Sequence, residues 1–150
     1  MIKRLWTILP LLLAACHPAT PTAPAIDVRD AWVRETAPGQ ASGAAYLTIV
    51  NSGREGDRLV GVSTPRATGA MLHGSSHSGG VMTMRMMDAV PIAGGATVTL
   101  APMGTHIMLT GVATPLKVGE RVPLTLRFAR AGERQVDAAV LAAGSNGPAR

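Results

Sequence analysis

From Ile26 to Leu141 the sequence alternates apolar and polar residues in short segments that turn-forming residues separate. Such period-two alternation places every second side chain on the same face of a β-strand. The 17 glycines and 11 prolines supply frequent turns, which shortens each segment to a few residues. The pattern therefore predicts an all-β domain and argues against long helices.

Nine segments fit this pattern. The expected strands are Ile26–Val33, Ala44–Asn51, Asp57–Ser63, Ala67–His73, Val81–Asp88, Ala96–Leu100, Thr105–Thr110, Arg121–Arg130 and Gln135–Leu141. The serine-rich stretch Ser75–Gly79 is expected to be a turn that carries His77. Eight or nine short strands at this spacing indicate a β-sandwich or Greek-key barrel.

The first 25 residues have the composition of an export and anchoring segment. Residues 1–15 begin with basic residues, continue with an apolar run too short to cross a bilayer as a mature helix, and end in small residues, which predicts a signal peptide. The sequence Leu13-Ala14-Ala15-Cys16 resembles a bacterial lipobox, so we expect lipidation at Cys16 and a lipid-anchored periplasmic protein. An ordinary secretory signal, with Cys16 incidental, is the alternative. His17 differs from the Asp of inner-membrane retention signals, so an outer-membrane anchor is preferred.

The remaining chain divides into three parts. Residues 16–25 form a Pro/Thr/Ala tether, residues 26–143 form the β-domain, and residues 144–150 are expected to be a disordered tail. Without Lys3 and Arg4 the chain carries 12 basic and 9 acidic residues, a net charge of about +3. This mild charge, together with 3% aromatic residues, argues against a nucleic-acid-binding protein.

Methionine and histidine crowd into the stretch Met71–Met108, which holds seven of the eight methionines and three of the four histidines. Neutral thioether sulfur suits Cu(I), whereas zinc prefers thiolate, imidazole or carboxylate. Cys16 is the only cysteine in the chain, so a thiolate site is excluded, as is a blue-copper site, which needs a cysteine. The composition of this stretch therefore predicts a site for copper.

The strand period groups the donors by face, because residues two apart project to the same side. Three same-face sets result: Met71 with His73; Met82 with Met84 and Met86; and His106 with Met108. Each of three expected strands thus brings histidine, methionine or both to one face.

The residues His73, Met84, His106 and Met108 follow the pattern H-x10-M-x21-H-x-M. This spacing resembles the signature of the periplasmic copper chaperones called PCu(A)C, and the segments Pro91–Gly95, Pro115–Gly119 and Val122–Phe128 are similar to that family as well. The resemblance implies a cupredoxin-like β-barrel that binds one Cu(I) per domain through these four residues. It also implies delivery of the ion to the dinuclear copper site of cytochrome c oxidase subunit II, often alongside Sco-type proteins.

Other interpretations remain open for single residues and for the whole chain. Met71, His77, Met82 and Met86 are candidates for auxiliary ligands or apolar shielding, although a methionine in a strand is more often core filler and a histidine in a loop is more often solvated. We expect no enzymatic activity. The rival functions are copper buffering or resistance without a dedicated client, a copper redox enzyme, and an adhesive or assembly lipoprotein without metal.

Overall fold

The computed structural model describes residues 23–148, which contain ten β-strands and no helix. The strands are β1 (Ile26–Arg34), β2 (Ser42–Asn51), β3 (Asp57–Ser63), β4 (Ala67–Ser78), β5 (Val81–Met87), β6 (Val90–Ile92), β7 (Thr97–Leu100), β8 (His106–Val112), β9 (Arg121–Phe128) and β10 (Gly132–Leu141). The expected all-β architecture is confirmed. The described residues contain no helix long and apolar enough to cross a membrane.

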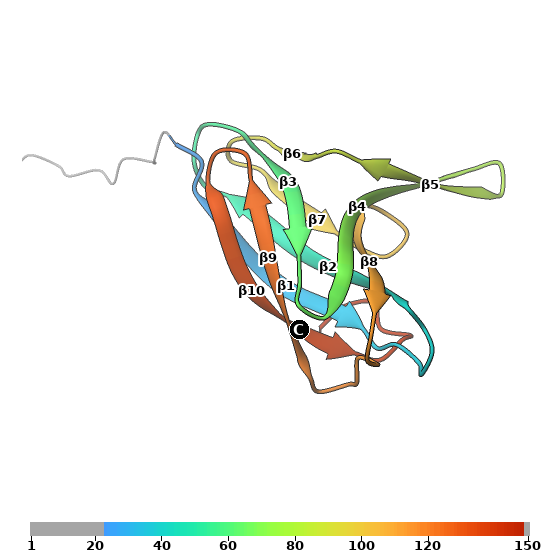
Figure 1. Ribbon diagram of the computed structural model, residues 1–150. Coiled ribbons are helices and arrows are strands. Elements are labelled where there is room, and N and C mark those ends of the chain that lie inside the picture. Colours follow the sequence, from blue (N-terminus) through green and yellow to red (C-terminus); the bar gives the residue numbers. More distant parts are fainter. Residues whose placement is uncertain (1–22, 149–150) are drawn as a thin grey trace, which may run out of the picture.

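All ten strands belong to one open sheet (Figure 1). Their order is β5-β4-β8-β2-β1-β10-β9-β3-β6, and β7 pairs with β2 outside this path. The pair β1–β10 is parallel, and every other pair is antiparallel. β4 and β8 are therefore neighbours although they are far apart in the sequence.

The apolar face of the sheet encloses a single core. Burial alternates along β9, where Val122, Leu124, Leu126 and Phe128 point inward, and it does so along β8, where Ile107 and Leu109 are buried. The sheet curls so that β3 lies close to β4, although the two strands are far apart in the strand order. Burying each such side chain contributes about 1.5–3 kcal/mol. Residues of the opposite parity in β8, including His106 and Met108, face away from the core.

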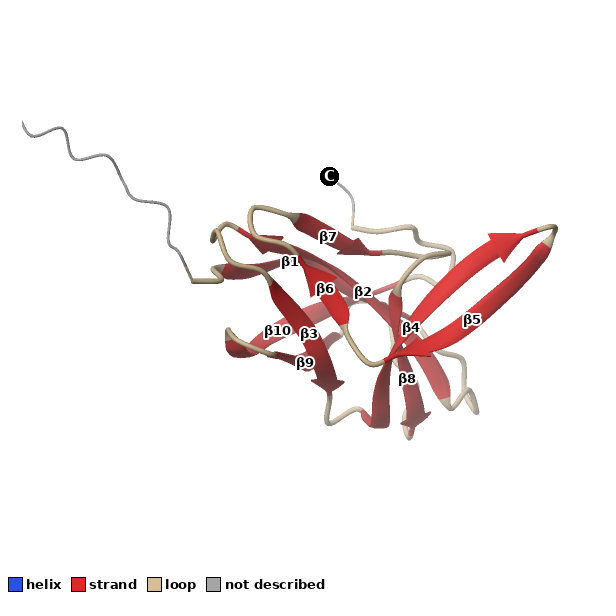
Figure 2. Ribbon diagram, turned by 90° about the horizontal axis from the view of Figure 1, so that it is seen from above, coloured by secondary structure: helices blue, strands red, loops and turns tan. Residues whose placement is uncertain are grey.

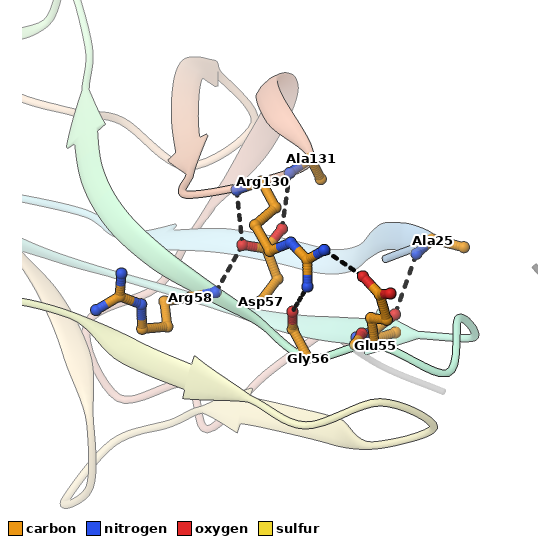
Figure 3. Close-up of polar contacts among 8 residues, drawn as sticks. Ala25, Glu55, Gly56, Asp57, Arg58, Arg130 and Ala131 are labelled. Atoms are coloured by element: carbon orange, nitrogen blue, oxygen red, sulfur yellow. Dashed lines mark hydrogen bonds and ion pairs between the residues drawn. The ribbon is translucent and has the colours of Figure 1, made fainter. Parts of the chain in front are cut away.

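Two buried polar side chains fix the loops at one end of the sheet. Asp57 accepts hydrogen bonds from the backbone N–H groups of Arg58 (2.8 Å), Arg130 (2.9 Å) and Ala131 (2.8 Å) (Figure 3). The Arg130 guanidinium also forms an ion pair with Glu55. The Asn51 side chain accepts from the N–H groups of residues 25 and 53 and donates to the carbonyls of residues 55 and 93. These bonds stabilise the same sheet that carries the histidines.

The structure corrects the expected end of β4. The predicted turn at Ser75–Gly79 is wrong, because β4 continues to Ser78 and His77 lies in the strand opposite Met82. The actual turn is the two-residue Gly79–Gly80 loop, whose φ angles of 58° and 80° suit a tight hairpin. The serines were misleading because they are turn formers, whereas pairing with β5 holds them in an extended conformation.

A second correction concerns β6, which was not predicted. Pro91 cannot donate a hydrogen bond to a neighbouring strand and so argued against a strand there. β6 forms the edge of the sheet and pairs only with β3, a position that tolerates proline.

The β4–β5 hairpin projects from the body of the molecule as an arm (Figure 2). Its base is joined to β8 through pairs from Ala67–Val112 to His73–His106, and beyond His73 only β5 continues to pair with β4. The arm therefore presents the methionine-rich strand β5 to solvent.

The predicted signal peptide, Cys16 and most of the predicted tether lie outside the described residues. The expected tail is described as far as residue 148, and the Ser145 carbonyl accepts a hydrogen bond from Arg34 Nη2 at 3.1 Å.

Candidate metal centre

Two histidines from distant parts of the chain stand directly opposite each other on neighbouring strands. β4 and β8 pair so that His73 lies across from His106 and Met71 lies across from Met108. The imidazole centroids of His73 and His106 are 5.9 Å apart, with the ring planes at 64°. Two imidazoles that bind one ion at about 2.0–2.1 Å through nitrogen have centroids at most about 6.5 Å apart. The observed separation is therefore compatible with a single ion held between the two rings.

A hydrogen bond orients the His106 ring. His106 Nδ1 lies 3.0 Å from the carbonyl oxygen of Gly104, which can only accept, so Nδ1 carries the proton and donates. The neutral ring then has its lone pair on Nε2, the nitrogen free to bind a metal. The same carbonyl accepts from the Ser75 N–H at 3.3 Å, which ties the loop before β8 to the arm.

The His73 ring has an unsatisfied polar atom. Its Nδ1 is buried and has no hydrogen-bond partner among residues 23–148. Leaving a buried polar atom unpaired costs about 1–3 kcal/mol, so such an atom calls for an explanation. A metal ion bound by this histidine is one explanation that also accounts for the nearby His106.

Met84 and Met108 complete the group from two different strands. Met84 lies on β5 opposite Ser75, two residues along β4 from His73. Met84, Met108 and His106 line one open pocket of about 350 Å³. Met84 is 56% exposed, which is unusual for an apolar side chain that merely fills space. The structure thus places His73 beside His106, and it places His106 at one pocket with Met84 and Met108.

The four other candidates lie around this group. Met86 faces His73 across the β4–β5 pair, and Met71 and Met86 line a second hollow together with Val60 and Val62 of β3. His77 and Met82 face each other near the tip of the arm, and both are exposed.

Sequence reasoning missed an aromatic and cationic wall beside the pocket. Tyr46 of β2 stacks on Trp32 with centroids 4.4 Å apart, and its ring centroid is 6.3 Å from that of His106. The Arg34 guanidinium lies 5.7 Å from the Tyr46 ring centroid. Burial raises the pKa of the Tyr46 phenol, and the nearby Arg34 charge opposes this rise only in part. Tyr46 is the only tyrosine in the chain, and it lies two residues along β2 from Ala44, the partner of Met108 in β8.

The described residues lack the side-chain sets that form the commonest metal sites. No cluster of three or more His, Cys, Asp or Glu side chains occurs among residues 23–148. The soft donors that lie at the same pocket as His106 are the thioethers of Met84 and Met108. Two imidazoles and two thioethers carry no charge, and this soft, neutral set suits Cu(I).

Known proteins resemble the chain over the whole of this sheet. The model of the LpqE-like lipoprotein family matches residues 26–140. A protein of Leifsonia xyli subsp. xyli that is named as a lipoprotein, Lxx21020, is 36% identical over 107 residues, which are 71% of this chain and 63% of that protein. The matched region thus spans less than two thirds of the length of this relative.

Solved structures of copper-binding domains share the fold. The copper-bound PCuAC domain of PmoF2 is 30% identical, with a TM-score of 0.67, and the match covers 80% of this chain and 95% of that domain. The Cu(I) form of DR1885 from Deinococcus radiodurans is 35% identical, with a TM-score of 0.57, and the match covers 86% of this chain and 80% of that protein. The apo form of the PmoF2 domain gives a TM-score of 0.69 at 29% identity, covering 84% of this chain and 99% of that domain.

Proposed function

The chain belongs to the LpqE-like lipoprotein family and has the fold of PCuAC domains, and from this premise we propose that it is an extracytoplasmic copper chaperone. Its cargo is one Cu(I) ion, and its ligands are His73, Met84, His106 and Met108. The observation that carries the proposal is the pairing of the His73 and His106 rings, together with the pocket that His106 lines with Met84 and Met108. Copper-bound relatives with the same fold support the choice of metal.

The proposed mechanism is ligand exchange. His106 binds through Nε2 because the Gly104 carbonyl holds the proton on Nδ1. Met84 is the most accessible donor, since it is 56% exposed and lies on the projecting arm. An incoming donor of the acceptor protein displaces Met84 first and the two histidines last, so that copper is never released to solvent.

The proposed location is the periplasm, where a lipidated Cys16 anchors the chain to a bacterial membrane. The lipoprotein name of the Leifsonia relative and of the family supports an anchor. Metabolic labelling with a fatty-acid analogue tests it: the wild type is labelled and Cys16→Ser is not. Separating the inner and outer membranes of the labelled cells then tests the preferred outer-membrane location.

The proposed client is the dinuclear copper site of cytochrome c oxidase subunit II, reached directly or through a Sco-type protein. Deleting the gene tests this. Loss of oxidase activity that added copper restores supports delivery, whereas unchanged oxidase activity with lower copper tolerance supports the alternative, a buffering or resistance protein without a dedicated client.

The proposed mechanism makes and breaks no bond in an organic substrate. Copper-loaded protein is therefore expected to show no turnover with oxygen or peroxide beyond that of free copper. Turnover that His106→Ala abolishes would instead identify a copper redox enzyme.

A further inference from the structure

One face of the β4–β5 arm carries six side chains, which we call the methionine face: His73, Ser75, His77, Met82, Met84 and Met86. They form three cross-strand pairs, which are the outer pair His77–Met82, the middle pair Ser75–Met84 and the inner pair His73–Met86. Directly opposite residues on one face have Cβ atoms about 4.5–5.5 Å apart. Each methionine can therefore reach the side chain opposite to it.

The outer pair lies further along the arm than Met84, the outermost of the four proposed ligands. It adjoins the Gly79–Gly80 loop at the far end of the arm, away from the core (Figure 2). Met82 is 47% exposed and its neighbour Val81 is 63% exposed, so these side chains do not stabilise the fold by burial. A histidine facing an exposed methionine at this tip therefore needs another explanation.

We propose that His77 and Met82 form a second soft-metal site of lower affinity, which receives Cu(I) at the tip of the arm and passes it to Met84. This inference rests on the proposed function in one respect, since it assumes the same cargo. Metal bonds of about 2.0 Å to nitrogen and 2.3 Å to sulfur fit within the span of such a pair. With two protein donors instead of four, the outer pair binds more weakly than the four-residue site.

The spacing along the arm suits transfer. Residues two apart on a strand are separated by about 6.8 Å, which places Met82 and Met84 in neighbouring pairs on the same face. The Cu–sulfur bond to Met82 breaks as the bond to Met84 forms, and the Cu–nitrogen bond to His77 breaks as the ion moves inward. The ion stays Cu(I), and the neutral imidazole is released without a proton transfer.

The methionine face carries no negative charge, which favours a soft monovalent ion over a hard divalent one. The six side chains of the methionine face include no carboxylate, and Arg85, opposite Gly74, belongs to the other face of the hairpin. Divalent hard ions prefer oxygen ligands that the methionine face supplies only as the Ser75 hydroxyl.

The experiment is an NMR titration with Ag(I), a soft monovalent probe, of protein labelled at the methionine methyl groups. In the wild type the first equivalent is expected to shift the methyls of Met84 and Met108, and the second equivalent to shift the methyl of Met82 and the His77 ring. His77→Ala and Met82→Leu are each expected to remove the second equivalent and to leave the affinity for the first within about 2-fold, because separate sites act independently. Met103→Leu, which alters an exposed methionine outside the arm, is the matched control and retains both equivalents.

A double variant separates this inference from the proposed function. His106→Ala/Met108→Leu removes two ligands from β8 and leaves the arm unchanged, so it is expected to bind one Ag(I) that shifts Met82. Wild-type protein that binds the first equivalent but never shifts Met82 overturns the outer site alone. A second equivalent that persists in His77→Ala and in Met82→Leu overturns it as well.

Discussion

Replacing Met84 with leucine removes one sulfur donor while almost preserving the shape of the side chain. Met84 is 56% exposed, so the free energy of unfolding is expected to change by less than about 0.5 kcal/mol. The Cu(I) affinity, in contrast, should fall steeply. Residues that merely orient a ligand are worth about 10–100-fold in metal affinity, so loss of a ligand is expected to cost at least about 100-fold, or about 2.7 kcal/mol.

Met87→Leu is the matched control for this change. Met87 lies next in β5 to Met86 but faces Leu72 and packs against the core. A methionine-to-leucine change there costs less than about 1.5 kcal/mol of stability and removes no proposed ligand. The assay is competition with a Cu(I) chelator under anaerobic conditions, with urea unfolding of both variants. A Met84→Leu protein that folds normally and keeps wild-type Cu(I) affinity would refute the assignment of Met84 as a ligand.

Three further predictions concern pH and stability. Because a proton and a metal ion compete for the same imidazole nitrogen, Cu(I) affinity should be lower in acid than at neutral pH, and an equal affinity under both conditions would show that His73 and His106 are not ligands. Asp57→Asn leaves one acceptor oxygen for three backbone N–H donors, so urea unfolding should show a free energy of unfolding that is lower by about 1–3 kcal/mol. The control Glu133→Gln, at an exposed position, should leave this free energy unchanged. Equal stability of the two variants would contradict the role of Asp57. Burial raises the pKa of Tyr46, so its absorbance should titrate at higher pH in the folded than in the urea-unfolded chain. Since the unfolded chain then loses this proton first, stability declines as the pH rises past about 10; a folded-state titration at or below that of the unfolded chain would contradict this.

The sequence allowed the fold class to be predicted because alternation depends only on which face of a strand is buried. The bounds of nearly every expected strand therefore differ by only a few residues from those of an observed strand. β6 was missed because proline disfavours strands, although an edge strand can accommodate Pro91. The end of β4 was missed because serine favours turns, although pairing with β5 outweighs this preference.

The candidate site could be predicted only in part. Strand period alone shows that His106 and Met108 share a face, but it cannot show that His73 lies opposite His106, because that register depends on pairing between strands about thirty residues apart. The spacing pattern supplied this information through a family resemblance. The Gly104 carbonyl, which orients His106, and the wall formed by Tyr46 and Arg34 depend on loop geometry and packing, for which the sequence carries no comparable signal.

The most direct test of the account is X-ray absorption spectroscopy of the purified protein loaded with one equivalent of Cu(I). The account predicts an environment of two nitrogen donors at about 2.0 Å and two sulfur donors at about 2.3 Å, with one sulfur lost in Met84→Leu. A spectrum without sulfur donors, or protein that takes up no Cu(I), would contradict the claim that these four neutral side chains form a copper site.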